Sequence, residues 1–157
     1  MRKSYIVSAK RTAIGSFLGG LATVKPKDMG SAVVKALLED ANVAPENVDE
    51  VICGNVLGAG LGQNIGRTIA LEAGIPETVC AHSVNMVCGS GLRTVMEAVM
   101  SIQCGFNDIV VAGGVESMSG APYLIPANTR TGNKMGNFTV VDHMIYDALT
   151  DARANIH

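Results

Sequence analysis

The stretch VNMVCGSGLRTV, residues 84–95, joins an apolar run to a helical pattern through a cysteine and a pair of glycines. Cys88 follows the apolar residues directly, and Gly89 and Gly91 come just after it. This order predicts that Cys88 lies where a strand turns into the N-terminus of a helix. The backbone N–H groups and the helix dipole at such a place favour an anion, so Cys88 is a candidate thiolate nucleophile.

The two glycines support this interpretation, because they remove side chains from the turn and leave room for a substrate carbonyl. A space-filling role for Cys88 stays open at this point, since free cysteines are most often buried and inert. The same role is predicted for Cys53, Cys80 and Cys104, which lie outside any such turn.

Around this stretch, apolar runs alternate with helical patterns. Predicted strands lie at residues 5–7, 51–53, 84–87 and 109–112. Predicted helices run from an Asp28 cap to Ala41, from Ile65 to Ala73 before Gly74, and from Cys88 to Gln103 before Gly105, with a short helical turn after Ala44. The alternation predicts an α/β domain with a mostly parallel sheet, helices on both faces, and residues 109–112 as a strand buried on both faces.

The later part of the chain has a different character. Residues 117–137 are rich in Ser, Gly, Pro, Asn and Thr with little periodicity, which predicts a long loop. A further helix is expected within residues 141–154, although its pattern is less regular.

Composition excludes several classes of function. The chain has 157 residues, with 12 basic and 14 acidic side chains and no dense basic cluster, so nucleic-acid and membrane-surface binding are not expected. It has no run of 18 apolar residues, so neither a signal peptide nor a membrane span is expected. Four cysteines without a Cys-x-x-Cys pair predict free thiols in a reducing cytoplasm and no metal site.

Several segments taken together are more specific than any one of them. They are Asn85–Arg93, Gly113–Ser119, Gly62–Arg67 and Ala9–Gly15, supported by Lys134–Gly136 and Asp142–Asp151. In these segments the chain resembles the thiolases, most closely the biosynthetic acetyl-CoA acetyltransferase group.

The resemblance implies a function for Cys88. In that family the matching cysteine accepts an acyl group from coenzyme A, and a second acetyl-CoA is then condensed onto it, or a β-ketoacyl chain is cleaved in reverse. The resemblance also implies that the backbone N–H of Cys88 helps bind the oxyanion, and that Gly89 and His157 contact substrate. His82 and His143 match no family site and are interpreted as structural.

The same resemblance implies the architecture, the partners and the cofactor requirement. Residues 1–118 would be the first α/β half of a layered fold, and residues 119–157 the start of an inserted loop domain. Homodimers or homotetramers are expected, with coenzyme A thioesters as substrates and no cofactor.

The match is also incomplete. Thiolases are more than twice as long, and Ile156 stands where the family usually has tyrosine. The Asn-Glu-Ala-Phe segment, the Gly-His-Pro histidine and the Cys-x-Gly-Gly-Gly cysteine have no counterpart here. The isolated chain is therefore predicted to be inactive. Two alternatives stay open: a related condensing enzyme such as a β-ketoacyl synthase, and a non-enzymatic chain that associates with a partner half.

Overall fold

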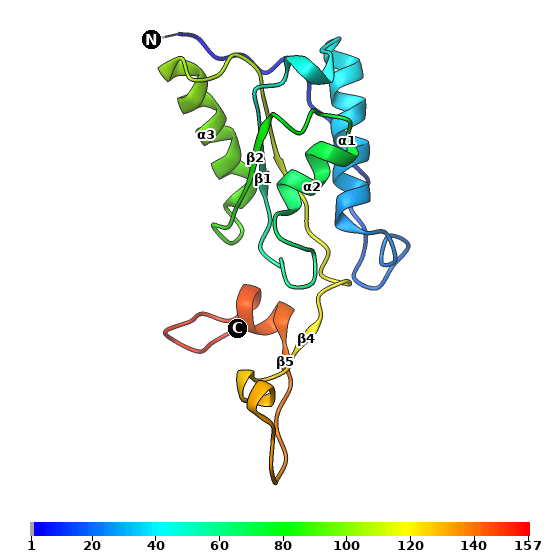
Figure 1. Ribbon diagram of the computed structural model, residues 1–157, viewed down its shortest axis with the longest axis vertical. Coiled ribbons are helices and arrows are strands. Elements are labelled where there is room, and N and C mark those ends of the chain that lie inside the picture. Colours follow the sequence, from blue (N-terminus) through cyan, green and yellow to red (C-terminus); the bar gives the residue numbers. More distant parts are fainter. Residues whose placement is uncertain (1) are drawn as a thin grey trace.

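The computed structural model describes residues 2–157 and is built on a parallel three-stranded sheet (Figure 1). β1 (Glu50–Gly54) lies in the middle and pairs with β2 (Cys80–Val84) on one side and β3 (Val110–Gly114) on the other. Parallel neighbours need long crossover connections, and helices supply them here. The predicted α/β class is confirmed.

Helices cover both faces of the sheet, as predicted. α1 (Pro26–Ala41) and α2 (Ile65–Glu72) pack against each other on one face, and α3 (Ser90–Cys104) covers the other (Figure 1). The expected helical turn is present at Pro45–Asn47. Within residues 2–157, no helix has the length and hydropathy that crossing a membrane requires.

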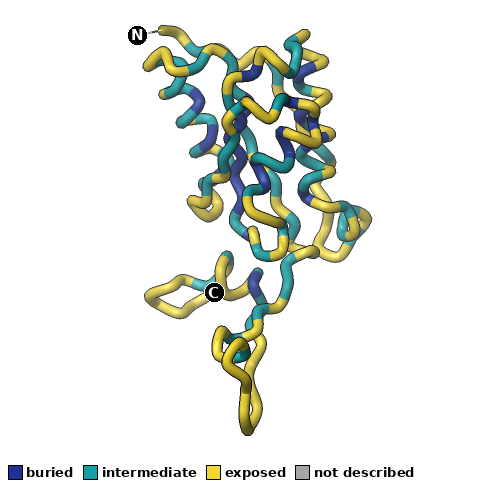
Figure 2. Tube along the Cα trace, in the orientation of Figure 1, coloured by how far each residue is buried: buried dark blue, intermediate teal, exposed yellow. Residues whose placement is uncertain are grey.

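The hydrophobic core lies between the sheet and the pair of α1 and α2, where buried positions gather in Figure 2. Its buried members include Val34, Leu38, Val51, Cys53, Ile65, Ile69, Ala70 and Val111. β1 is the strand buried on both faces, whereas β3 buries Val111 alone. The prediction of two-sided burial for residues 109–112 is therefore wrong, because β3 lies at the edge of the sheet.

The start of α1 also differs from the prediction. The sequence predicts Asp28 as the cap, but the helix begins at Pro26, after Lys25, whose side chain makes no capping hydrogen bond. Proline suits the first helical position, because its missing N–H would have no partner there and its φ is already helical. Asp28 lies in the first turn, where its carboxylate faces the positive end of the helix dipole.

The other two helices agree with the sequence. The side chain of Asn64 caps α2 by accepting from the backbone N–H of Arg67 at 3.1 Å. Gly66 lets α2 approach the sheet closely, since a Cβ there would lie 2.6 Å from the carbonyl oxygen of His82. Gly105 ends α3 with a φ of +80°, in the left-handed region that favours glycine.

Two predicted strands are wrong. Residues 5–7 pair with no other strand in the described chain, and Ile6 is 82% exposed. A β-branched run forms a strand only where a neighbour completes its ladder, and here none does. Residues 84–87 are not a strand either, because β2 ends at Val84 and side-chain hydrogen bonds then draw the backbone into a turn.

The C-terminal part forms a small hairpin that extends away from the sheet (Figure 1). β4 (Tyr123–Leu124) pairs antiparallel with β5 (Val141–Asp142), and a 3-10 helix at Ala127–Thr131 lies between them. The long loop predicted at 117–137 thus contains a strand and a short helix. The helix expected within 141–154 is confined to a short π-helix, Met144–Leu149. The domain boundary after residue 118 stays a prediction.

Candidate active site

Cys88 is exposed and lies two residues before α3. It belongs to a tight turn of residues 85–90, called here the cysteine turn. Val87, directly before it, has a φ of +49°, which is unusual for a β-branched residue and costs on the order of 1–3 kcal/mol. A residue in so strained a conformation needs other contacts to hold it in place.

Side-chain hydrogen bonds hold the cysteine turn in this shape. The hydroxyl of Ser90, which is 5% exposed, accepts from Met86 N at 2.9 Å and donates to Val87 O at 2.6 Å. Asn85 Oδ1 accepts from Val87 N at 3.0 Å. The backbone around Cys88 is thus fixed by its own sequence neighbours.

The cysteine turn also packs against the ends of the strands. A Cβ on Gly54, the last residue of β1, would lie 2.8 Å from the carbonyl carbon of Ser90 and 2.9 Å from the N atom of Gly91. Only a glycine allows α3 to begin this close to the carboxyl end of β1. A Cβ on Gly91 would meet nothing within 4 Å, so a side chain there would occupy the space in front of the turn.

Cys88 opens into a cavity of about 460 Å³, called here the Cys88 cavity. Its lining residues come from four parts of the chain: Gly54, Val56 and Leu57; Val87, Cys88, Ser90 and Gly91; Gly114, Val115, Glu116 and Met118; and Ala148 and Leu149. Most of these side chains are small or apolar. The cavity therefore suits an apolar group that reacts with the thiol.

Glu116 organises one wall of this cavity. Its carboxylate accepts from Val56 N at 2.9 Å, from Leu57 N at 3.0 Å and from Asn55 Nδ2 at 2.9 Å. The loop after β1 is thereby tied to the end of β3. No role was predicted for Glu116 from the sequence, although an acid directly after the glycines and valine that end an apolar run was a signal for such a contact.

Glu116 is also the one titratable side chain, apart from Cys88 itself, among the described residues that line the cavity. The carboxylate oxygens of Glu116 already accept three hydrogen bonds, which gives this side chain a structural role. Among the described residues, no hydrogen bond joins Glu116 to the Cys88 thiol.

The structure brings Cys88 and Gly89 together but not His157. Gly89 directly precedes α3 and donates its N–H to Met86 O at 3.0 Å. His157 is exposed at the end of the described chain and is not among the residues that line the Cys88 cavity. Substrate contact by His157 and Gly89 stays a prediction.

The other thiols lie in different surroundings. Burial raises the pKa of Cys53 to about 11, so this thiol is protonated and shielded at neutral pH. Cys80 and Cys104 are exposed but do not line the Cys88 cavity. No cluster of three or more His, Cys, Asp or Glu side chains within residues 2–157 could hold a metal ion.

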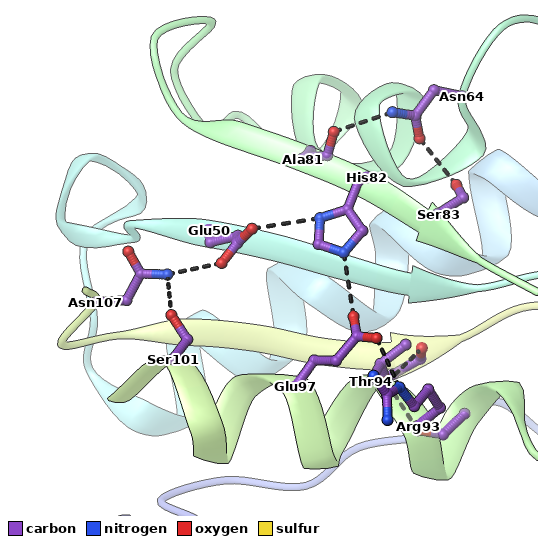
Figure 3. Close-up of polar contacts among 12 residues, drawn as sticks. Glu50, Asn64, Ala81, His82, Ser83, Arg93, Thr94, Glu97, Ser101 and Asn107 are labelled. Atoms are coloured by element: carbon purple, nitrogen blue, oxygen red, sulfur yellow. Dashed lines mark hydrogen bonds and ion pairs between the residues drawn. The ribbon is translucent and has the colours of Figure 1, made fainter. Parts of the chain in front are cut away.

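His82 belongs to a polar network that joins two strands to α3 (Figure 3). Its ring nitrogens lie 3.3 Å from a carboxylate oxygen of Glu50 and 3.3 Å from one of Glu97. Arg93 Nε donates to Glu97 at 2.7 Å, and this contact is the main reason that the pKa of Glu97 lies below its usual value. The network lies outside the cavity lining, in keeping with a structural role for His82.

Comparison with known proteins gives the family context. Residues 4–157 match the model of the thiolase N-terminal domain. The chain is 50% identical over 157 residues to an acetyl-CoA acetyltransferase of Escherichia coli, covering 100% of this chain and 40% of the relative. It is 53% identical over 152 residues to a cytosolic acetyl-CoA acetyltransferase of Mus musculus, covering 97% of this chain and 38% of the relative.

A solved structure agrees with these matches. A thiolase from Ascaris suum, crystallised in complex with coenzyme A, superposes with a TM-score of 0.91 at 38% identity, covering 96% of this chain and 39% of that one. The chain thus spans about two fifths of the length of the proteins it matches.

Proposed function

This chain belongs to the thiolase family, and from that premise we propose that the complete protein is an acetyl-CoA C-acetyltransferase that uses Cys88 as its nucleophile. The proposed reaction is the reversible condensation of two acetyl-CoA molecules to acetoacetyl-CoA. The observation that carries the proposal is the position of Cys88: an exposed thiol before a helix, facing a largely apolar cavity of about 460 Å³.

The proposed first step is acyl transfer. The Cys88 thiolate attacks the thioester carbonyl of acetyl-CoA, the bond from carbon to the sulfur of coenzyme A breaks, and the thiol of coenzyme A leaves with the proton. The N–H groups of Gly89 and Ser90 already donate to Met86 O and Val87 O. The N–H of Cys88 is therefore the donor that the cysteine turn offers to the oxyanion.

The proposed second step is carbon–carbon bond formation. A second acetyl-CoA loses a proton from its methyl group, and the resulting carbanion attacks the acetyl carbonyl on Cys88. The bond from carbon to sulfur breaks, Cys88 leaves as a thiolate, and acetoacetyl-CoA is released. Both proton transfers need bases, and the resemblance to thiolases implies that these are the Gly-His-Pro histidine and the Cys-x-Gly-Gly-Gly cysteine, which have no counterpart in this sequence.

Localisation and assembly belong to the same proposal. We propose a cytoplasmic location, supported by relatives whose names describe them as cytosolic. We also propose that the complete protein is a homodimer or homotetramer. The free edge of β2, which lies at one side of the sheet, is available to a second copy. Light scattering of the complete protein after size-exclusion chromatography gives the subunit number, and a monomer at micromolar concentration contradicts this part of the proposal.

Acetylation of Cys88 is the direct test of the proposed function. After brief incubation of the complete protein with acetyl-CoA, peptide mass mapping should find acetyl on Cys88 alone. Cys88→Ser should lose turnover by several orders of magnitude, because a hydroxyl is far less ionised than a thiol at neutral pH. The exposed Cys104 provides the matched control, and Cys104→Ser should keep full turnover. Acetyl found chiefly on Cys53, Cys80 or Cys104 contradicts the assignment.

A further inference from the structure

His143, which directly follows β5, is unusual in the C-terminal part because it is buried. Among residues 112–157, all of which the structure describes, it is the only buried one, at 6% exposure. Its neighbours in the hairpin are half-buried or exposed. A buried polar ring in so open a segment indicates specific contacts rather than core filling.

Three parts of the chain meet at His143. Its Nδ1 lies 2.5 Å from Asp147 Oδ2, in the π-helix that follows it. Its Nε2 accepts from the backbone N–H of Ala59 at 3.4 Å, in the loop after β1. Its own backbone N–H donates to Pro122 O at 3.2 Å, where the hairpin begins.

These contacts define the tautomer of the ring. A backbone amide can only donate, so Nε2 must carry a lone pair and accept. The ring proton then lies on Nδ1, where it is donated to Asp147. His143 thus bridges the loop after β1 and the π-helix.

The two bridged segments both line the Cys88 cavity. Val56 and Leu57 come from the same loop as Ala59, and Ala148 and Leu149 follow Asp147 in the π-helix. We propose that His143 is a positioning residue: by bridging these two segments it sets the width of the Cys88 cavity and hence its fit to a short acyl thioester. This inference rests on the proposed function for the identity of the substrate, but not for the geometry of the cavity.

Two substitutions of His143 separate the bridge from simple burial. In His143→Asn the amide nitrogen can replace Nδ1 and donate to Asp147, but nothing reaches Ala59. In His143→Gln the amide oxygen can replace Nε2 and accept from Ala59. Because His143 directly precedes the π-helix, its contact to Ala59 alone joins the two segments, so the loss should appear in the Asn variant and be largely rescued in the Gln variant.

The kinetic test uses the complete protein and compares KM with kcat. His143→Asn should raise KM for acetoacetyl-CoA about three- to ten-fold, the range expected for one neutral hydrogen bond, and leave kcat within about two-fold. His143→Gln should stay within about two-fold of the parent in both. The proposal is wrong if KM changes equally in the two variants or in neither. Both amides would replace a merely buried ring equally poorly, and KM would then change equally in the two.

A second readout does not depend on turnover. Alkylation of Cys88 by iodoacetamide and by the bulkier N-benzyliodoacetamide reports the width of the cavity. The rate ratio of bulky to small reagent should rise in His143→Asn, which lacks the contact to Ala59, and stay unchanged in His143→Gln, which keeps it. An unchanged ratio in both variants contradicts the inference. If the parent protein neither acetylates nor cleaves a thioester, the proposed function is wrong, and this ratio still decides the role of His143.

Discussion

At the scale of single residues, the strained Val87 and the buried Ser90 show how the chain presents its thiol. We expect Ser90→Ala to slow acetylation of Cys88 about ten-fold, because it removes the acceptor of Met86 N and the donor to Val87 O that hold the cysteine turn. Stopped incubations with acetyl-CoA, followed by mass spectrometry, measure this rate. Ser101→Ala, near the far end of α3, is the control and loses one hydrogen bond from Asn107 without effect on the rate. Equal rates in both variants contradict this account.

Also at this scale, the buried Cys53 should be the least reactive thiol. Its pKa of about 11, raised from 9.0 by burial, leaves it mostly protonated at pH 9, where an ordinary thiol is half ionised. Iodoacetamide at pH 9 should modify Cys80, Cys88 and Cys104 but spare Cys53, as peptide mapping can determine. Because the unfolded thiol ionises first, the contribution of Cys53 to stability is complete below pH 9 and is lost as pH rises toward 11. Early modification of Cys53 would show that it is not shielded.

At the scale of elements, the contact between β1 and α3 depends on the absence of a side chain at Gly54. Gly54→Ala places a Cβ within 2.9 Å of two backbone atoms of α3, so the helix must shift, at a cost of about 1–3 kcal/mol. Gly113→Ala, on the neighbouring strand β3, meets nothing within 4 Å and is the matched control. Urea unfolding of the complete protein should find a lower midpoint for Gly54→Ala alone. Identical midpoints for the two variants contradict the close approach.

At the scale of the whole molecule, α3 has an apolar stripe that this chain leaves uncovered. Leu92 is 70% exposed, and Met96 and Met100 are nearly half exposed. We expect the isolated chain to associate or aggregate and to be inactive in thiolysis, since it has this apolar surface and no counterpart of the two bases that the resemblance to thiolases implies. Activity should appear only when the remaining half of the protein is supplied in trans.

Size-exclusion chromatography with light scattering and a thiolysis assay test both parts of this prediction. A double variant, Met96→Lys with Met100→Lys, should make the isolated chain more soluble, because it breaks the stripe with charge. Thiolysis by the purified 157-residue chain, at a rate abolished by Cys88→Ala, contradicts the prediction. Such a result would mean that a base within these residues serves Cys88.

The local structure and the position of Cys88 before α3 could be predicted from the sequence alone. Helical periodicity, glycines after helices and short apolar runs located α1, α2, α3, β1 and β3, because these signals act between residues close in the chain. The glycines after Cys88 marked the start of α3 for the same reason. The resemblance carried by the sequence motifs then gave the family, which the comparisons confirm.

Strand pairing and long-range side-chain contacts depend on residues that are distant in sequence. Residues 5–7 have strand propensity but no partner, so propensity alone misplaced them. His143 is separated from Ala59 by 84 positions, and Glu116 from Val56 by 60, so local patterns could not identify the partners of either side chain. Strand pairing and burial depend on the whole folded chain, whereas helix ends and turns are determined by residues only a few positions apart.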